Sequence, residues 1–250
     1  VCALPVPRSQ VSALGILQVN DEQRVIRFVE KPKEPAVLDE LKLADPLLSS
    51  IGVTKSEDHY LASMGIYVFN REILRKALDN DQTDFGKHII PMMLEARDKV
   101  YAYSFFDNTI PGMEPHERGY WRDVGAIDTY FEANMDLISV TPQLNLYNYQ
   151  WPILTNQGNL PPAKTVFDSE GRRGHNLDSL VCGGCVTSGS VVRRSILGPS
   201  CRVNSYASVE DSILFDNVDI GRNAKIRKAI IDEGIVIPEG MEIGYDHEED

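Results

Sequence analysis

The sequence predicts an α/β domain followed by a parallel β-helix. In the first 139 residues, strand-like segments alternate with helix-like segments. From Leu197 to Ile243, apolar residues recur in steps of six or five, which is the rhythm of stacked β-helix coils. Between these parts, residues 140–178 are rich in proline and lack sustained periodicity. We therefore expect a first domain over residues 1–139, a linker over 140–178 and a β-helix over 179–250.

The first domain is expected to begin with a strand at residue 1, followed by a β-hairpin over residues 15–30. Apolar and polar residues alternate weakly from Gly15 to Val19, and Asn20-Asp21-Glu22 supplies the turn. Residues 32–58 are rich in Pro, Asp, Glu and Ser, so we expect a surface excursion with a short helix at 37–44.

Residues 61–69 form a nearly continuous apolar run, which predicts a buried central strand. A helix is predicted at 71–79 and a further strand at 100–106. Asp84 could cap another helix, which Pro91 would break or kink. A helix over 127–139 is predicted from side chains at 3.6-residue spacing, which are Ile127, Phe131, Asn134 and Ile138.

The β-helix prediction depends on nine apolar positions: Leu197, Val203, Val209, Leu214, Ile220, Ile226, Ile231, Ile237 and Ile243. Neither a strand, with its period of 2, nor a helix, with its period of 3.6, produces these steps. Each residue is expected to point into a narrow prism. Gly198, Gly221 and Gly244 directly follow three of them, where tight corners need small residues.

The net charge of −12 makes a nucleic-acid partner unexpected, because such proteins normally carry a basic stripe. A bound phosphate would need a local positive pocket, for which Lys31 and Arg122 are candidates. No apolar run approaches the roughly 18 residues that span a bilayer, so no membrane association is expected. No signal peptide is visible, and a strand at residue 1 suggests that the chain begins inside a domain.

Cys182 and Cys185 form a C-x-x-C, which is half of a zinc site or a redox pair in some proteins. A second close pair is missing, and the nearby extras are Cys201 and His175. We interpret these cysteines as small, partly buried thiols in a glycine-rich turn region. Reduced thiols fit a cytoplasmic protein.

Glu30-Lys31-Pro32 is expected at the end of a strand, where α/β sheets place their ligands. A carboxylate can accept hydrogen bonds from sugar hydroxyls and a lysine can neutralise a phosphate, but residue chemistry alone favours a solvated charge pair at the strand exit. Ser63 and Tyr67, four residues apart in the apolar run, would share a sheet face and could bind a sugar. Alternatively, Tyr67 is a core residue.

Asp84-Phe85-Gly86 is interpretable as a helix cap. Trp121-Arg122-Asp123-Val124-Gly125 combines an aromatic ring, a cation, a carboxylate and a glycine. Asp123 could ligate a Mg²⁺ that bridges phosphates, although a surface pair of Arg122 with Asp123 is the simpler alternative. Dinucleotide-binding, Walker, H-E-x-x-H and G-x-S-x-G motifs are absent from the sequence.

In matching order, these stretches resemble the bacterial ADP-glucose pyrophosphorylases, also called glucose-1-phosphate adenylyltransferases. The resemblance covers essentially the whole chain, and the further segments that carry it are 5–9, 131–137, 146–153, 160–164, 188–190 and 237–240. It implies that residues 1–139 are the C-terminal portion of a Rossmann-like, GT-A-like nucleotidyltransferase domain. It also implies that the β-helix is left-handed.

The family uses Mg²⁺ to join ATP and α-D-glucose 1-phosphate into ADP-glucose, the precursor of glycogen, and pyrophosphate. By resemblance, Glu30 and Lys31 contact glucose 1-phosphate, with Lys31 on its phosphate, and Asp123 holds the catalytic Mg²⁺. Lys31 and Asp123 would be the catalytic residues. The side chains that would line or shape the glucose site are Ser63, Tyr67, Asp84, Phe85 and Trp121. The resemblance further implies a cytoplasmic homotetramer in which effectors are sensed.

The family's glycine-rich triphosphate loop, its adenine contacts and one metal-binding aspartate are absent from this sequence. We therefore expect roughly the first third of the enzyme to be missing and the chain alone to be inactive. The chain also stops where relatives continue, and its segment between Lys31 and Ser63 is longer than in some of them.

Three alternatives remain. A related enzyme could use UTP, GTP or dTTP, because the base is selected by the absent part. A hexapeptide-repeat acyltransferase is disfavoured, since no histidine lies between His175 and His247 in the coils. A non-catalytic regulatory or scaffolding subunit is disfavoured by the intact Glu30-Lys31 and Trp121–Asp123 stretches.

Overall fold

The computed structural model describes residues 1–43, 58–156, 158–169 and 171–245. The chain divides into two compact units, Val1–Trp121 and Arg122–Asp250. The division lies before the predicted boundary at residue 139, because the helix predicted over 127–139 groups with the coils that follow it. Most of the predicted excursion at 32–58 lies outside the described residues.

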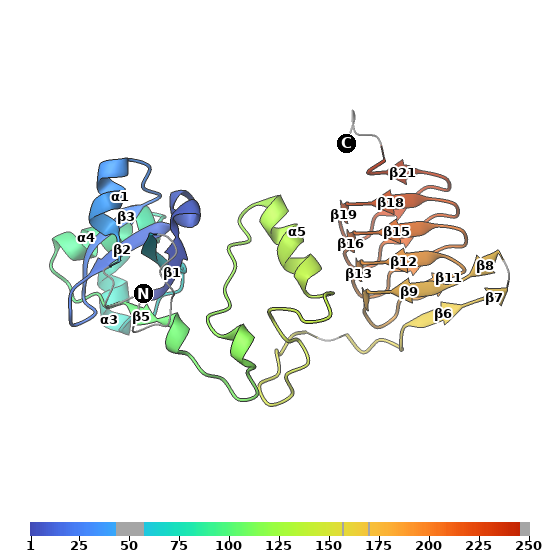
Figure 1. Cartoon of the computed structure of the whole chain (residues 1–250), viewed down its shortest axis with the longest axis horizontal. Coiled ribbons are helices and arrows are strands. Elements are labelled where there is room, and N and C mark those ends of the chain that lie inside the picture. The colour runs from blue at the N-terminus through green and yellow to red at the C-terminus, as the bar shows by residue number, and fades with distance from the viewer. Residues whose placement is uncertain (44–57, 157, 170, 246–250) are drawn as a thin grey trace. The chain divides into compact units, whose positions relative to one another are not determined.

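The first unit contains a five-stranded sheet in the order β3-β2-β4-β1-β5 (Figure 1). Its strands are β1 (Cys2–Pro7), β2 (Gly15–Val19), β3 (Val25–Glu30), β4 (His59–Ser63) and β5 (Tyr103–Ser104). Strand pairs are antiparallel except for β1 with β5. The predicted hairpin is confirmed as β2–β3, and Asn20 builds its turn by accepting the backbone N–H groups of Glu22 and Arg24.

Each face of this sheet has its own core. Ile16 and Tyr60 pack on one face with Leu41 of α1 (Pro35–Leu41). Leu17 and Leu61 pack on the other with Ile90 of α4 (Ile90–Glu95). Successive residues of one strand point to opposite faces, so α1 and α4 cover opposite sides of the sheet.

The other helical elements among the described residues of this unit are α3 (Arg71–Ala77), the 3₁₀ turns η1 (Arg8–Ala13), η3 (Phe105–Asp107) and η4 (Pro115–Glu117), and the π-helical turn η2 (Phe85–Ile89). The helix predicted at 71–79 is confirmed as α3, which Asn70 caps by accepting the N–H of Glu72. The short helix predicted at 37–44 is confirmed but begins earlier, at Pro35.

Three predictions in this unit need correction. The strand predicted over 61–69 ends at Ser63, because Gly65 adopts a φ of +70° and turns the chain, leaving Val68 88% exposed. Pro91 does not break the helix: the π turn η2 precedes it, and Pro91 occupies the first turn of α4, where its missing N–H is not needed. The strand predicted over 100–106 shrinks to β5.

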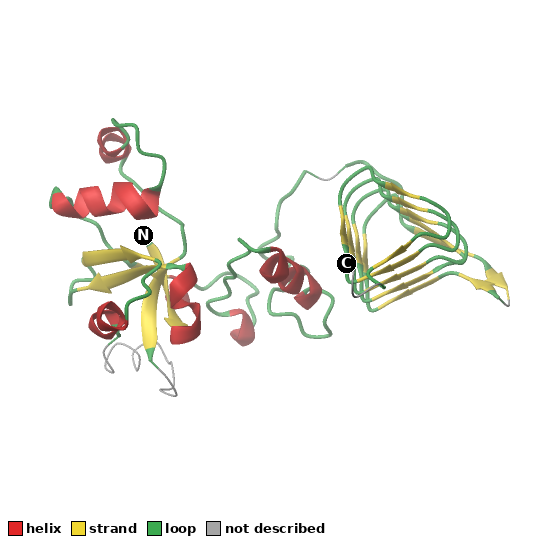
Figure 2. Ribbon diagram, turned by 90° about the horizontal axis from the view of Figure 1, so that it is seen from above, coloured by secondary structure: helices red, strands yellow, loops and turns green. Residues whose placement is uncertain are grey.

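The second unit begins with α5 (Ile127–Asp136), which confirms the predicted helix, and continues into parallel coils. Figure 2 shows these coils end-on as a triangle with strands on its sides. One sheet contains β6 (Lys164–Val166), β11 (Val186–Ser188), β14 (Arg202–Val203), β17 (Asp219–Ile220) and β20 (Val236–Ile237). A second contains β9 (His175–Leu177), β12 (Val191–Arg193), β15 (Ser208–Glu210), β18 (Lys225–Arg227) and β21 (Glu242–Ile243). The third contains β10 (Leu180–Val181), β13 (Ile196–Leu197), β16 (Ile213–Leu214) and β19 (Ile230–Ile231).

These pairings are parallel, so the predicted β-helix is confirmed. Its first strand, β6, lies before the predicted start at residue 179, and a small hairpin of β7 (Asp168–Ser169) and β8 (Arg172–Arg173) follows it. The predicted inward positions from Leu197 to Ile237 are at most 7% exposed.

The corners of the coils repeat in register. Arg194, Asp211 and Lys228 recur every 17 residues, and all three have a positive φ of 43–49°. At another corner, a methyl group on Gly221 would lie 2.6 Å from the carbonyl oxygen of Ile237. Small residues are therefore required at such corners because the next coil passes so closely.

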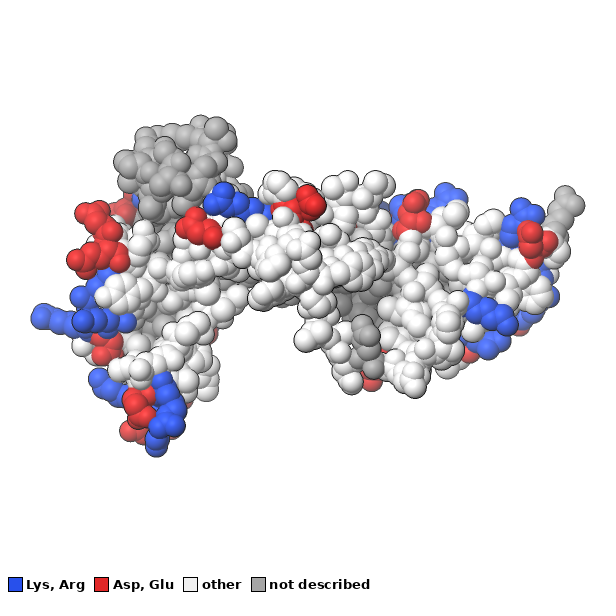
Figure 3. Space-filling model, turned by 90° about the horizontal axis from the view of Figure 1, so that it is seen from below, with Lys and Arg blue, Asp and Glu red and all other residues white. Residues whose placement is uncertain are grey.

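On the face shown in Figure 3, acidic and basic side chains are interspersed and do not form one basic stripe. Among the described residues, no helix has both the length and the apolar composition needed to cross a membrane. Cys185 and Cys201 are buried and Cys182 is half-buried, so the burial predicted for the thiols of the C-x-x-C segment is confirmed.

Candidate functional site

Glu30, the last residue of β3, lies in a slot between two glycines. A methyl group on Gly15, its partner in β2, would lie 2.8 Å from Glu30 Oε2, and one on Gly86 would lie 2.6 Å from the same atom. Side chains at either position would displace the carboxylate. Burial raises the pKa of Glu30; nearby Lys31 opposes this shift, Asp84 adds to it and Lys87 opposes it.

Lys31 follows directly and ends the strand. Its φ of +48° turns the backbone, and its N–H donates to the carbonyl oxygen of Leu14 at 3.0 Å. The side chain is exposed, as is suitable for a cation that meets a phosphate. The predicted placement of Glu30 and Lys31 at a strand end is confirmed.

Asp84 caps the helical segment that contains Phe85 and Gly86, as the cap interpretation predicted. Its Oδ1 accepts the backbone N–H of Lys87 at 2.8 Å, and this hydrogen bond lowers the pKa of Asp84. Its Oδ2 lies 3.8 Å from Lys87 Nζ. A methyl group on Gly86 would lie 2.6 Å from Glu30 Oε2 and 3.5 Å from Asp84 Oδ1, so the two carboxylates belong to one cluster.

Ser63, Tyr67 and Phe85 complete this cluster. The rings of Tyr67 and Phe85 stack at 5.3 Å between centroids, with 22° between their planes. Burial raises the pKa of Tyr67, the side-chain hydrogen bond with Ser63 opposes the shift, and Glu30 and Asp84 add to it. Ser63 and Tyr67 therefore meet as predicted, but the turn at Gly65 brings them together rather than a continuous strand.

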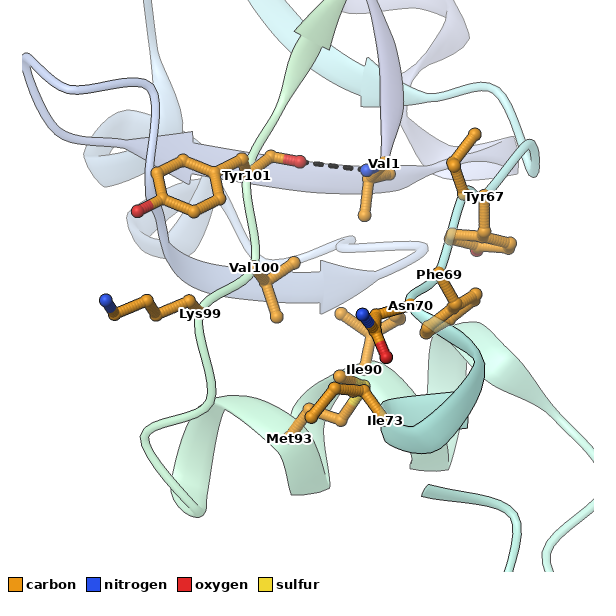
Figure 4. A pocket seen from close by; sticks show the side chains of 11 residues that line it. Val1, Tyr67, Phe69, Asn70, Ile73, Ile90, Met93, Lys99, Val100 and Tyr101 are labelled. Carbon is orange, nitrogen blue, oxygen red and sulfur yellow. Dashed lines mark hydrogen bonds between the residues drawn. The ribbon is translucent and has the colours of Figure 1, made fainter. Parts of the chain in front are cut away.

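Tyr67 also borders a pocket of about 200 Å³ on the side of Val1 and Val100 (Figure 4). Its walls are mostly apolar and include Phe69, Ile73 and Met93. Neither Glu30 nor Asp84 lines it. The pocket is therefore distinct from the polar cluster, although the two share Tyr67.

Trp121 is placed differently from the other predicted site residues of the first unit. It packs against the core cluster of Leu14 and Ile16, whereas Tyr67 and Phe85 pack against the cluster on the other face of the sheet. The structure thus joins Glu30, Ser63, Tyr67, Asp84 and Phe85, with Lys31 at their edge, and puts Trp121 on the opposite face.

Arg122 and Asp123 belong to the second unit. Arg122 donates to Gln143 Oε1 at 3.2 Å and lies 3.9 Å from Asp136 Oδ2, so its ion pair is with Asp136, and the surface pair with Asp123 considered above was wrong. Asp123 is exposed, and its Oδ1 accepts the N–H of Gly125.

One exposed carboxylate fits the mode in which Mg²⁺ takes one or two carboxylates and completes its shell with substrate oxygens and water. The described part of the chain holds no cluster of three or more His, Cys, Asp or Glu that would bind a metal by itself. Asp123 is thus suited to be one ligand among several.

Sequence reasoning assigned no role in the site to three residues of the cluster. The roles of Gly15 and Gly86 depend on approaches between distant segments, which no local pattern reveals. Lys87 could have been found, because it lies three residues after the capping Asp84, where a cap accepts the backbone N–H.

Comparison with known proteins agrees with this architecture. The profile of the nucleotidyl transferase family matches residues 1–140, and that of the GlmU-like C-terminal hexapeptide region matches residues 161–250. The chain is 56% identical over its whole length to proteins named glucose-1-phosphate adenylyltransferase from Trichlorobacter lovleyi and Geobacter metallireducens, of which it covers 58%. It is 50% identical over 98% of its length to one from Rhodopirellula baltica, of which it covers 52%.

The chain thus spans little more than half the length of these relatives, and the resemblance inferred from its motifs is confirmed. Because the family profile covers more than half of the chain, including every residue of the polar cluster, the chain belongs to the nucleotidyl transferase family.

Proposed function

We propose that the full-length protein containing this chain joins ATP and α-D-glucose 1-phosphate into ADP-glucose and pyrophosphate. The observation that carries the proposal is the convergence of Glu30, Asp84, Ser63 and Tyr67 in one cluster beside the exposed Lys31. Relatives at 56% identity bear the name of this activity. The chain would supply the sugar-phosphate side of the site.

In this proposal the sugar is held by complementary chemistry. Glu30 and Asp84 accept hydrogen bonds from hydroxyl groups, which carboxylates do well when ionised. The stacked rings of Tyr67 and Phe85 offer an apolar surface to one face of the sugar. Lys31, at the end of β3, neutralises the phosphate.

The reaction needs no nucleophile from the protein. A phosphate oxygen of glucose 1-phosphate attacks the α-phosphorus of ATP in line, and pyrophosphate leaves. Lys31 lowers the repulsion between the two anions, and the sugar contacts fix the direction of attack, so positioning and charge neutralisation provide the catalysis. Mg²⁺, with Asp123 as one ligand, would neutralise further phosphate charge when bound.

We also propose, on the resemblance, that the full-length protein is a cytoplasmic homotetramer that serves glycogen synthesis and responds to effectors. The parallel coils would contribute to its assembly.

The test is an assay of pyrophosphate release by the full-length protein from glucose 1-phosphate with Mg²⁺, with ATP, UTP, GTP and dTTP compared in parallel. Strong preference for ATP is the expected result. Preference for another nucleotide would keep the sugar site but refute ADP-glucose synthesis. A folded protein without turnover on any of them would favour a regulatory subunit.

A further inference from the structure

We propose that Lys87 is a positioning residue of the sugar site, whose ammonium group keeps the Glu30 and Asp84 carboxylates ionised together while Lys31 is engaged by phosphate. This inference rests on the proposed function, because it assigns the two carboxylates to the sugar. It concerns how the site holds its charges and adds no contact between Lys87 and the substrate.

The location of Lys87 is fixed by its own backbone. Its N–H donates to Asp84 Oδ1 at 2.8 Å, and its Nζ lies 3.8 Å from Asp84 Oδ2. The main chain and the side chain of Lys87 therefore both interact with the Asp84 carboxylate. The preceding residue, Gly86, lies against Glu30 Oε2. The turn from 84 to 87 therefore holds the Lys87 ammonium at Asp84 and Gly86 against Glu30, and the positive charge of Lys87 also acts on Glu30.

The charges of the cluster balance only when both lysines are counted. Glu30 faces Lys31, Asp84 and Lys87, and it also acts on Tyr67. Asp84 additionally faces His88. Two carboxylates thus stand against two ammonium groups, and two like charges this close favour protonation of one of them unless cations compensate.

Substrate binding upsets this balance. A bound phosphate dianion draws on the positive charge of Lys31 and adds negative charge to the site. Lys87 is then the cation that remains with Glu30 and Asp84. Without it, the carboxylate with the higher proton affinity would take up a proton, and a protonated carboxyl accepts sugar hydroxyl hydrogen bonds more weakly.

Glu30 is the carboxylate concerned, because burial already raises its pKa, whereas the hydrogen bond from Lys87 lowers that of Asp84. Removing a nearby cation raises the pKa of Glu30 further. The ionised form is the active one, so activity is lost as the pH falls through this value. The acidic limb of binding should therefore move to higher pH in a variant without the cation.

The test compares K87M, K87R and the control K76M in the full-length protein. Lys76 lies on α3 with a similar ion pair, 3.7 Å from Asp98, outside the polar cluster. Calorimetric titration with glucose 1-phosphate across a pH series gives the dissociation constant. Carboxyl NMR titration of Glu30 and Asp84 without ligand gives their ionisation directly.

For K87M we expect an acidic limb of binding and a Glu30 titration that are both higher by about half a pH unit, as expected for a pair partly screened by water. Binding of glucose 1-phosphate should then be about threefold weaker on the acidic side of that limb and little changed well above it. K87R should restore both, K76M should match the wild type, and the Michaelis constant for the nucleotide should not change. An unshifted Glu30 titration in K87M, or failure of K87R to restore it, would overturn the role of Lys87. A wild-type protein that binds no glucose 1-phosphate would instead refute the proposed function, and the NMR titration would still decide the inference.

Discussion

The replacement of Gly86 by alanine should damage the sugar site while leaving the fold intact. The new methyl group would lie 2.6 Å from Glu30 Oε2, whereas a carbon and an oxygen in contact need about 3.3 Å, so the carboxylate has to move by roughly 0.7 Å. Space toward β2 is limited, because even a methyl group on Gly15 would lie only 2.8 Å from the same oxygen. We therefore expect the carboxylate to swing out of the slot.

The same geometry predicts little effect on stability. The atoms nearest to the new methyl group belong to the far end of the Glu30 side chain, at 2.6 and 3.2 Å, with Asp84 Oδ1 at 3.5 Å. Gly86 does not have a positive φ, so alanine can adopt its backbone conformation. Alanine in a helical turn is favoured over glycine by about 0.5–1 kcal/mol, which offsets the cost of moving one carboxylate.

The loss should appear in the affinity for glucose 1-phosphate. A hydrogen bond to a charged group contributes about 1.5–3 kcal/mol, and losing the smaller value corresponds to about a tenfold change. We therefore expect G86A to raise the Michaelis constant for glucose 1-phosphate about tenfold in the full-length protein, with an unchanged constant for ATP and an unchanged melting temperature.

The matched control is G158A, whose methyl group would meet its nearest neighbour, Leu160, at an ordinary 3.4 Å. It should behave as the wild type in both measurements. A folded G86A enzyme with normal affinity for glucose 1-phosphate would refute the reasoning, because the position of Glu30 would then not matter for the sugar.

Three further variants test other parts of the molecule. K31A should raise the Michaelis constant for glucose 1-phosphate by at least tenfold and far more than that for ATP; equal changes in both would contradict the assignment of Lys31 to the sugar phosphate. G221A should lower the free energy of unfolding by about 1–3 kcal/mol in urea titrations, because its methyl group meets the backbone of the next coil. The control G183A, whose methyl group would lie 3.4 Å from its nearest neighbours, should leave the free energy of unfolding unchanged. Equal stabilities of the two variants would contradict the corner packing. Arg194 donates to both oxygens of Asp211 and lowers the pKa of that carboxyl, so the pair stabilises the fold above the ordinary pKa of aspartate and loses this effect as the pH falls through the lowered value. R194Q should therefore lower the free energy of unfolding slightly at pH 7 and by less at pH 3, and a difference from the wild type that widens in acid would contradict this.

The β-helix was predictable because its rule is local. Each coil buries a side chain every five or six residues, so the positions from Leu197 to Ile237 reveal the prism directly. The earlier start at β6 was hidden, since Lys164 and Thr165 are exposed there and the strand offers no apolar series. The apolar series therefore reveals the coils whose interior is filled by large side chains, but not the strand pairing of β6 that precedes them.

The first unit shows where composition misleads. Ile66 and Val68 look like a continuation of β4, yet one residue with a positive φ, Gly65, ends the strand and leaves both exposed. The slot around Glu30 could not be predicted from the sequence for another reason. Gly86 lies far along the chain from Gly15, and only the folded sheet brings both glycines to one carboxylate. Residue types suggested the members of the site, but their distances required tertiary structure.

The corner column of Arg194, Asp211 and Lys228 limits how this fold can change during evolution. Each coil pairs with the coil before it and the coil after it, and from Val191 on the corners, inward side chains and charged pairs keep a 17-residue interval, whereas Leu180 and Val186 pair with residues 16 positions later. Gain or loss of a whole coil preserves every alignment, whereas a shift of one residue within a strand turns inward side chains to solvent from there to the end of that coil. The natural unit of insertion and deletion in this region is therefore the coil. Shorter length changes should be confined to the corners between strands, where one early coil is a residue shorter than those after it, and to excursions outside the stack, such as the hairpin of β7 and β8.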